Sequence, residues 1–533
     1  MLIRLFHTLR HLRLIQLVFQ VWYRCYRAQP STAAAPCRRL PQTLPGFLHL
    51  HPVELTGPQR IVLLNDEADI PTDWRAPDRS DLWNYHLHYF DDLNAKSADA
   101  RVLWHRDLIT SWIRANPPRV GIGWDAYPTA LRIVNWVKWG LRHDLPLEAH
   151  QSIALQARTL ASSLEYHLLA NHLFADAKGL FFAGLWFGGE EGDRWLHRGR
   201  NLLAEQISEQ ILGDGGHYER SPMYHQTILV DLLDIDAACQ GWAVLPPTGL
   251  GAAIRRMRTW AAAMAHPDGD IAFFNDACLG AAPSPAAVEH QLSSVKRPEP
   301  NAIPEGLLAE SGFYRLQTGP LNLLMDVGNI APAYQPGHAH AGSLSIEVSA
   351  FGRRLFVNSG TSLYGRSAER LRQRGTAAHN TLAIGQHNSS DVWSGFRVGK
   401  RARVDLLASG RRAVKASHNG YSFLGARHTR EVTGTETALT IEDSLEGDEA
   451  IVGTVRWFLH PEVCVERDGD RGCRLNIVDG GRLHLATSNP LRIVDSTWHP
   501  RQGVVLDNKC LEIEVLRNNL LLSTLTWTEP NLD

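Results

Sequence analysis

The hydrophobic periodicity of this chain changes near residue 300, and that change constrains the fold more than any other feature. Between about residues 80 and 290, apolar residues recur at spacings of three and four, as at Leu131, Val134 and Val137, which is typical of helices. After about residue 310, short runs alternate between apolar and polar residues, as at residues 344–348, which is typical of strands. Helices followed by strands predict two segregated domains rather than a parallel α/β sheet.

The length of the chain supports this division. Its 533 residues exceed the roughly 250–300 at which a single core stops growing. We expect an N-terminal segment at residues 1–45, a domain of helical hairpins at residues 46–300 and an antiparallel β-sandwich at residues 301–533. Short joints rich in Gly or Pro separate the expected helices, one of which should cover residues 153–169. Paired helices of this kind indicate a toroid or a solenoid.

Composition excludes several classes of protein. A net charge of −2 gives no overall excess of positive charge that would favour nucleic acid, so we expect no nucleic-acid partner. The seven cysteines form no CxxC motif, which argues against a zinc finger or a disulfide framework and mildly favours a reducing compartment. The 16 Trp and 25 His are compatible with a large core or with a site where flat rings stack on sugars.

The first 25 residues are basic and partly apolar. Arg4, Arg10 and Arg13 precede an apolar run at residues 14–23, which Gln16 and Gln20 interrupt. The run is far shorter than the roughly 20 residues that cross a bilayer, and it is a poor secretory signal. We expect a basic amphipathic helix that packs on the body or lies on a membrane surface, followed by a linker at residues 29–46. These N-terminal features favour a cytoplasmic or membrane-peripheral location. An activity on extracellular glycans would instead favour the periplasm.

Three separated clusters of polar residues suggest proton-transfer chemistry. They lie at residues 171–172, 217–225 and 335–340. The amide of Asn171 can donate hydrogen bonds without titrating, the phenol of Tyr224 can hold or deliver a proton, and the imidazole of His338 exchanges protons near neutral pH. Because Asn171 and Tyr224 fall in the helical half and His338 in the strand half, we expect the site in a cleft between the domains.

Five sequence blocks together carry a resemblance to a known family. The blocks at residues 82–90, 166–174, 214–225, 337–340 and 378–381 resemble those of the heparinase II/III-like polysaccharide lyases. The resemblance implies an incomplete (α/α) toroid followed by an antiparallel β-sandwich. It also implies β-elimination on an anionic polysaccharide that contains uronic acid, such as a glycosaminoglycan or alginate, without an obligatory cofactor.

Elimination from a uronide sets the roles of the site residues. Removal of the C5 proton next to a carboxylate needs a group that binds the carboxylate, a base at C5 and an acid at O4. The resemblance assigns the carboxylate to Asn171, while Tyr224 and His338 share the acid and base roles in an order that stays open. Cationic neighbours could lower the pKa of Tyr224 enough for base work. The residues expected to bind substrate are His172, His217, Arg220, His225 and Arg374.

A metal site is a separate question. In some relatives two His and one Asp hold a structural metal in the strand domain. The matching positions here are His340, His379 and Asn358, where Asn removes the anionic ligand and weakens the site. Zinc would suit the two imidazoles. Alternatively, the two histidines form a hydrogen-bonded pair that braces the catalytic loop.

Two other functions remain open. A glycoside hydrolase on the same scaffold would need a pair of carboxylates, for which Glu219, Asp214 and Asp276 are the candidates. A non-catalytic glycan-binding protein of a bacterial surface-polysaccharide system would need no proton transfer at all. The sequence does not specify the glycan, its sulfation, endo or exo action, or the oligomeric state.

Overall fold

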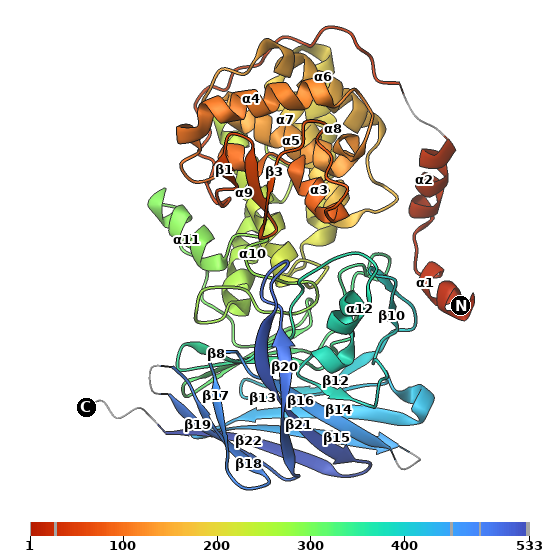
Figure 1. Ribbon diagram of the computed structural model, residues 1–533, viewed down its shortest axis with the longest axis vertical. Coiled ribbons are helices and arrows are strands. Elements are labelled where there is room, and N and C mark those ends of the chain that lie inside the picture. Colours follow the sequence, from red (N-terminus) through yellow and green to blue (C-terminus); the bar gives the residue numbers. More distant parts are fainter. Residues whose placement is uncertain (1, 26–28, 448–450, 479–480, 529–533) are drawn as a thin grey trace.

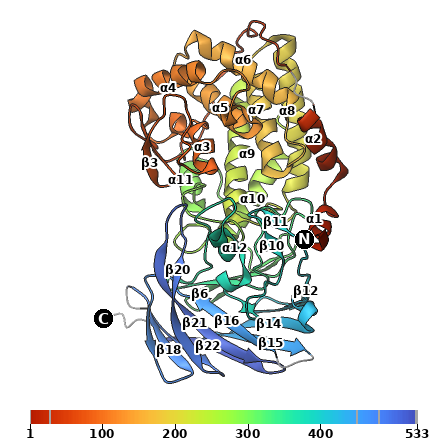
Figure 2. The ribbon, with the colours of Figure 1, turned by 45° about the vertical axis from the view of Figure 1, so that its right-hand side comes forward.

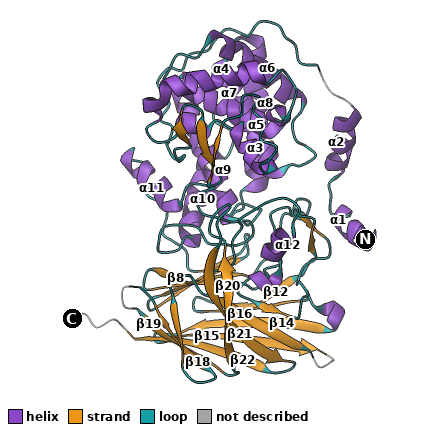
Figure 3. Ribbon diagram, viewed as in Figure 1, coloured by secondary structure: helices purple, strands orange, loops and turns teal. Residues whose placement is uncertain are grey.

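A computed structural model of the protein describes residues 2–25, 29–447, 451–478 and 481–528. Its helices gather at one end of the molecule and its long strands at the other (Figures 1 and 3). The prediction of a helical half followed by a strand half is therefore confirmed.

The helical domain is organised around one buried helix. Helix α7 (Ala170–Trp186) packs against α5, α6, α8 and α9, and His172 alone among its residues is not buried. Small residues allow the close approach, because a Cβ on Gly184 or Gly199 would overlap backbone atoms of the neighbouring helix. The other helices of this domain are α3 (Asp81–Leu87), α4 (Val102–Ala115), α5 (Ala126–Gly140), α6 (Leu147–Ser162), α8 (Gly189–Gln210), α9 (Pro222–Trp242), α10 (Leu250–Met264) and α11 (Pro285–Ser294), with 3-10 turns η1 (Asp91–Asn94), η2 (Ala98–Arg101) and η3 (Ile122–Trp124).

Two details of the helical domain differ from the sequence prediction. The helix expected over residues 153–169 ends at Ser162, where the hydroxyls of Ser162 and Ser163 both donate to the carbonyl of Thr159 and compete with further helix bonds. A small antiparallel sheet was also missed. It comprises β1 (Leu55–Gly57), β2 (Arg60–Leu63) and β3 (Asp66–Asp69) and covers part of the helical domain.

The strand domain contains three larger antiparallel sheets. One has five strands in the order β4-β5-β6-β7-β8, one has eight in the order β12-β13-β14-β15-β22-β19-β18-β17, and one has four in the order β20-β21-β16-β9. Strands β10 and β11 form a separate ribbon. The bounds are β4 (Gly306–Leu308), β5 (Phe313–Thr318), β6 (Leu321–Asp326), β7 (Ile346–Ala350), β8 (Arg353–Phe356), β9 (Leu382–Ala383), β10 (Val392–Trp393), β11 (Arg397–Val398), β12 (Val404–Ser409), β13 (Ala413–His418), β14 (Ala426–Gly434), β15 (Ala438–Gly447), β16 (Val452–Phe458), β17 (Cys464–Arg467), β18 (Gly472–Asn476), β19 (Arg482–Thr487), β20 (Leu491–Trp498), β21 (Leu506–Leu516) and β22 (Leu520–Thr528).

The three sheets enclose one apolar core. Leu323 of β6, Ile441 of β15 and Ile513 of β21 belong to the same buried cluster, and alternate residues of β15 point into it. This is the packing of a β-sandwich. A short helix, α12 (Ala368–Arg374), lies on the side that faces the helical domain. The strand domain also contains the 3-10 turns η4 (Thr376–Ala378) and η5 (Ser422–Leu424).

The N-terminal segment forms two short helices rather than one. Helices α1 (Leu2–Leu9) and α2 (Leu14–Cys25) lie along one side of the molecule, with α2 beside the helical domain and α1 level with the junction of the two domains (Figure 2). In the described part of the chain, no helix combines the length and the hydrophobicity that crossing a membrane requires.

Candidate functional site

Asn171 stands at the strained start of the central helix. The two residues before it, Leu169 and Ala170, have φ angles of 62° and 53°, a backbone region that non-glycine residues rarely occupy. Strain of this kind persists only where the surroundings enforce it, and it concentrates at functional sites. The backbone N–H of Asn171 lies 3.4 Å from Oε1 of Glu219. Asn171 is largely buried, and within the described residues its side-chain amide makes no hydrogen bond to the protein.

Tyr224 is held in the first turn of α9. The hydroxyl of Ser221 accepts a hydrogen bond from the backbone N–H of Tyr224 at 3.2 Å, and Pro222 occupies the first helical position. This is the capped helix start that the Ser-Pro pair predicts. It places the half-buried phenol of Tyr224 at the end of α9 that faces the strand domain.

His338 reaches this phenol from the strand domain. The rings of Tyr224 and His338 are stacked, with centroids 3.9 Å apart and an interplanar angle of 13°. The loop that carries His338 is fixed at its carbonyl, which accepts a hydrogen bond from the backbone N–H of Asp276 at 2.9 Å. The structure thus brings together two residues 114 positions apart in the sequence.

Glu219 joins these groups into one network. Its Oε2 bonds to Nδ1 of His338, and its Oε1 faces the backbone of Asn171. Burial by itself would raise the pKa of Glu219, but the nearby His338 and His217 and the N–H of Asn171 outweigh burial and lower it. The carboxylate therefore stays ionised and fixes His338 through Nδ1, which leaves Nε2 for a substrate.

Tyr364 adds a second hydroxyl beside Tyr224. The two phenol oxygens are 3.2 Å apart, and the guanidinium of Arg370 lies over the Tyr364 ring at 4.8 Å. Burial, followed by the influence of Tyr364 and of Asp276, raises the pKa of Tyr224 well above its usual range. Tyr224 therefore holds its proton at neutral pH. The expectation that cationic neighbours lower this pKa is wrong.

His172 lines the helical side of the site with two tyrosines. Its Nδ1 bonds to Oε2 of Glu165 at 3.0 Å, and its ring packs 4.7 Å from that of Tyr127. Tyr127 packs in turn against Tyr89 at 5.8 Å. Although burial opposes it, Glu165 raises the pKa of His172, so this ring can present positive charge at the edge of the site.

Four residues expected to bind substrate are buried and bonded to the protein itself, which corrects that prediction. Arg220 pairs with Asp326 and donates to carbonyls of Ser311, Gly312 and Asn329. Every nitrogen of Arg374 donates to backbone carbonyls. Nε2 of His217 bonds to Gln210, and His225 bonds to the Met257 carbonyl while stacking on Trp260. Burial lowers the pKa of His217 to about 4 and that of His225 to about 3, so neither ring supplies a cation.

The proposed zinc ligands form a hydrogen-bonded brace instead. Nδ1 of His340 lies 3.1 Å from Nε2 of His379, and Nε2 of His340 bonds to Asp276 at 2.8 Å. Arg370 already neutralises Asp276 through both guanidinium nitrogens. The side-chain oxygen of Asn358 accepts the N–H of Asn380 at 2.9 Å. No anionic ligand is left to complete this set, so its residues do not fit a zinc ion.

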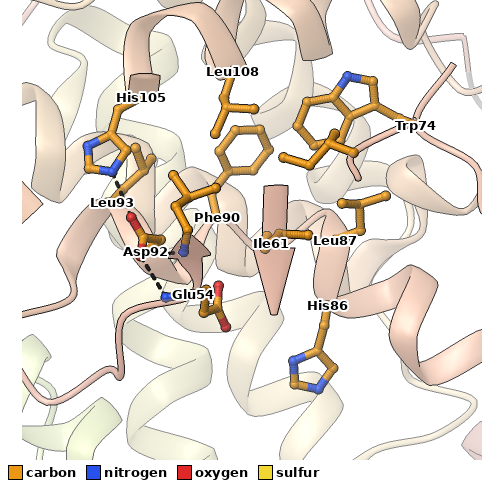
Figure 4. A pocket seen from close by; sticks show the side chains of 12 residues that line it. Glu54, Ile61, Trp74, His86, Leu87, Phe90, Asp92, Leu93, His105 and Leu108 are labelled. Carbon is orange, nitrogen blue, oxygen red and sulfur yellow. Dashed lines mark hydrogen bonds and ion pairs between the residues drawn. The ribbon is translucent and has the colours of Figure 1, made fainter. Parts of the chain in front are cut away.

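Another group of potential ligands lies elsewhere. Among the described residues, one set of His, Cys, Asp or Glu side chains is close enough to share a metal, namely Glu54, His86 and Asp91. It borders a small apolar cavity of about 20 Å³ near β2 and α3, where Asp92 bonds to His105 and to the backbone of Glu54 (Figure 4). Side chains can approach in this way without a metal, and no site is assigned here.

Sequence reasoning missed two members of the network. Glu219 was considered only as half of a hydrolase pair, although it lies two residues after His217 in the same polar cluster as Tyr224. Tyr364 carried no motif signal at all. It reaches the site because residues 357–364 return from β8 toward the helical domain, a path that only the fold determines.

Comparisons with known proteins agree with this architecture. Residues 147–294 match the family model described as Heparinase II/III N-terminus, and residues 303–517 match the model Heparinase II/III-like, C-terminal. The chain belongs to the heparinase II/III-like family. The two models match parts of both domains and contain four of the five blocks, all but the one at residues 82–90, so the family resemblance is confirmed.

Solved structures show the same fold. The crystal structure of heparinase III has a TM-score of 0.69 and 18% sequence identity, over 86% of this chain and 80% of that one. The Streptomyces coelicolor A3 chondroitin AC lyase, solved with chondroitin sulphate, has a TM-score of 0.53 and 10% identity over 84% of this chain and 74% of that one. The predicted fold, an (α/α) toroid followed by an antiparallel β-sandwich, is confirmed.

Two curated relatives carry names of different kinds. FtsZ-localized protein C of Caulobacter vibrioides (strain NA1000 / CB15N) is 26% identical over 414 residues, which span 66% of this chain and 69% of the relative. The heparin-sulfate lyase of Bacteroides stercoris is 25% identical over 252 residues, which span 42% of this chain and 37% of that enzyme. The chain thus aligns with less than half of the length of this lyase.

Proposed function

We propose that this protein is a polysaccharide lyase that cleaves a glycan containing uronic acid by β-elimination. The observation that carries the proposal is the stacked pair of Tyr224 and His338, which joins the two domains and is held by Glu219 on one side and Tyr364 on the other. A half-buried phenol and a half-buried imidazole in contact are suited to proton transfer at adjacent carbons of one sugar. The heparin-sulfate lyases among the relatives support the same chemistry.

The network suggests which residue removes the C5 proton and which residue donates a proton to the leaving O4 oxygen. Glu219 binds Nδ1 of His338, so Nε2 of a neutral imidazole would accept the C5 proton. Tyr224, whose raised pKa keeps it protonated, would donate to the leaving O4 oxygen. The free amide of Asn171 and the ring of His172 would hold the uronate carboxylate, where negative charge develops.

The geometry disfavours a glycoside hydrolase. Such an enzyme needs two carboxyl groups that face the substrate. Glu219 is bonded to His338, Asp276 to Arg370, and Asp214 to the backbone and hydroxyl of Ser311. All three candidates are thus committed to protein partners, and none is left as a free acid.

A non-catalytic role is the second candidate, and one observation favours it. FtsZ-localized protein C aligns with more of this chain than the B. stercoris lyase does, and its name gives a location rather than a reaction. A glycan-binding protein would keep the sugar-facing surface but would not depend on the proton held by Tyr224.

Product analysis separates these functions. The purified protein is incubated with a panel of acidic polysaccharides, and the ultraviolet absorbance of the 4,5-unsaturated uronide is followed. We expect absorbance with at least one substrate and a loss of roughly 10²-fold or more in the Tyr224→Phe variant, because the acid is removed. Saccharide release without absorbance would indicate a hydrolase. Glycan binding without release, unaffected by Tyr224→Phe, would indicate a binding protein.

A further inference from the structure

Helix α2 rests on the body of the protein through its polar and aromatic side. Nε2 of Gln16 donates to the carbonyl of Tyr334 at 3.3 Å. The Phe19 ring packs 4.8 Å from Tyr166, and the Tyr23 hydroxyl donates to the carbonyl of Leu164. Positions 16, 19 and 23 share one helix face, so the inward side of α2 is defined by these contacts.

The apolar side of both helices consequently faces outward. In α2, the exposed fractions of Leu14, Val18 and Val21 are 76%, 51% and 61%, and in α1 those of Ile3 and Phe6 are 76% and 63%. The spacing of 14, 18 and 21 makes a continuous stripe. Surface helices normally turn such a stripe toward the core. Because the stripe of α2 faces solvent instead, we expect a binding partner to cover it.

Unneutralised positive charge borders this apolar surface. In the described chain, no carboxylate lies within ion-pair distance of Arg10, Arg24 or Arg401. Burial, and to a lesser extent repulsion by the nearby Arg10, lowers the pKa of Arg401 to about 10. A partner with negative groups next to an apolar layer would satisfy both the stripe and these cations.

The helices also tie the two domains together at this place. Arg4 of α1 pairs with Asp391 at 2.7 Å, and the Trp393 indole donates to Thr8 at 3.3 Å. Arg13, between the helices, pairs with Glu209 of α8. The apolar surface is thus fixed to both domains rather than carried on a free tail.

We propose that the outward face of α1 and α2 attaches this protein to the surface of an anionic lipid bilayer. Helices with an apolar face and basic flanks lie in the headgroup region, where the apolar side chains reach the acyl boundary and Arg side chains meet the phosphates. The proposal is independent of the lyase activity. It commits to lipid because a second copy of this chain would bring the same unneutralised arginines face to face.

Vesicle flotation of the full chain tests this. Vesicles of phosphatidylcholine alone are compared with vesicles containing equal parts of phosphatidylglycerol, at low and at high salt. We expect flotation with the anionic vesicles at low salt, weakened by high salt, since the attraction to the surface is screened. Absence of flotation with both vesicle types would overturn the proposal.

Matched triple variants locate the surface. Phe6→Ser with Leu14→Ser and Val18→Ser should reduce vesicle binding by about tenfold or more, while leaving the thermal unfolding midpoint near that of the parent. The control carries Leu147→Ser, Leu245→Ser and Val505→Ser, which alter residues of similar exposure elsewhere (84%, 73% and 57%), and should bind as the parent does. Equal binding by both variants would overturn the proposal. So would a dimer, measured by light scattering, that only the α1–α2 variant dissociates.

Discussion

At the residue scale, Glu219 makes the most specific claim about mechanism. A carboxylate that fixes Nδ1 of His338 is a positioning residue, and its replacement by the neutral amide in Glu219→Gln should turn or retautomerise the imidazole. We expect kcat to fall by roughly 10²- to 10⁴-fold with KM little changed, as when the carboxylate behind a catalytic histidine is neutralised. The rate of appearance of unsaturated product measures this.

Asp214→Asn provides the control for that variant. Asp214 lies on the same loop, but its carboxylate caps Ser311 and the N–H of Gly216 rather than His338. The Asp214→Asn variant should therefore keep most of the activity. If Glu219→Gln were as active as Asp214→Asn, Glu219 would have no part in positioning the histidine.

The second hydroxyl of the site gives another prediction. Tyr364→Phe removes a hydrogen-bond partner from Tyr224 but leaves the acid itself in place. We expect a loss of roughly fivefold in kcat, smaller than that of Tyr224→Phe, because one neutral hydrogen bond contributes about 1 kcal/mol. Measurements of kcat for Tyr364→Phe, Tyr224→Phe and the double variant test this prediction. Additive losses would mean that the two phenols act independently.

The brace of His340 and His379 predicts insensitivity to metal removal. Because Arg370 neutralises Asp276 and Asn358 replaces an acid, chelation should leave both the rate and the unfolding midpoint unchanged. Activity after extensive dialysis against EDTA, with and without added zinc, measures this. A loss that zinc restores would mean that the brace binds metal after all.

At the element scale, the start of α9 is attached to the strand domain by Arg220. Its guanidinium reaches Asp326 at the end of β6 and three backbone carbonyls that lie just before β5 or just after β6. Arg220→Ala would leave Asp326 buried without its counter-ion, which typically costs about 3–5 kcal/mol. Denaturant unfolding should show this loss, whereas Arg492→Ala, which removes an exposed arginine from its pair with Glu512, should change the free energy of unfolding by less than about 1 kcal/mol.

The elements also show what sequence could and could not specify. The helix start at Ser221 and Pro222 was predictable because a cap is made by neighbouring residues. The role of Arg374 was not, because its carbonyl partners Ala339 and Gly395 lie 35 and 21 residues away. From the sequence, Arg374 was expected to bind the substrate. The fold instead uses this cation to satisfy buried carbonyls, and no local pattern distinguishes the two uses.

At the scale of the whole molecule, histidines buried in both domains make stability depend on pH. Burial lowers the pKa of His217 and His340 to about 4 and that of His225 and His379 to about 3, whereas an unfolded chain titrates near 6.5. As pH falls below about 6.5, the unfolded state binds protons that the native state does not, so the free energy of unfolding decreases. Each histidine contributes roughly 1.4 kcal/mol per pH unit until the native ring titrates.

The carboxylate of Asp234 acts in a different pH window from these histidines. Lys138 and Lys178, against the opposing effect of burial, lower the pKa of Asp234 to about 2, so its stabilisation is complete above about pH 4 and is lost only below it. Calorimetry should therefore show the midpoint of unfolding falling steadily from pH 7 to pH 5, with a shallower slope in His225→Gln. An equal slope in the parent and in His225→Gln would mean that this imidazole binds its proton equally well in the folded and unfolded states, against the lowered pKa that its burial produces.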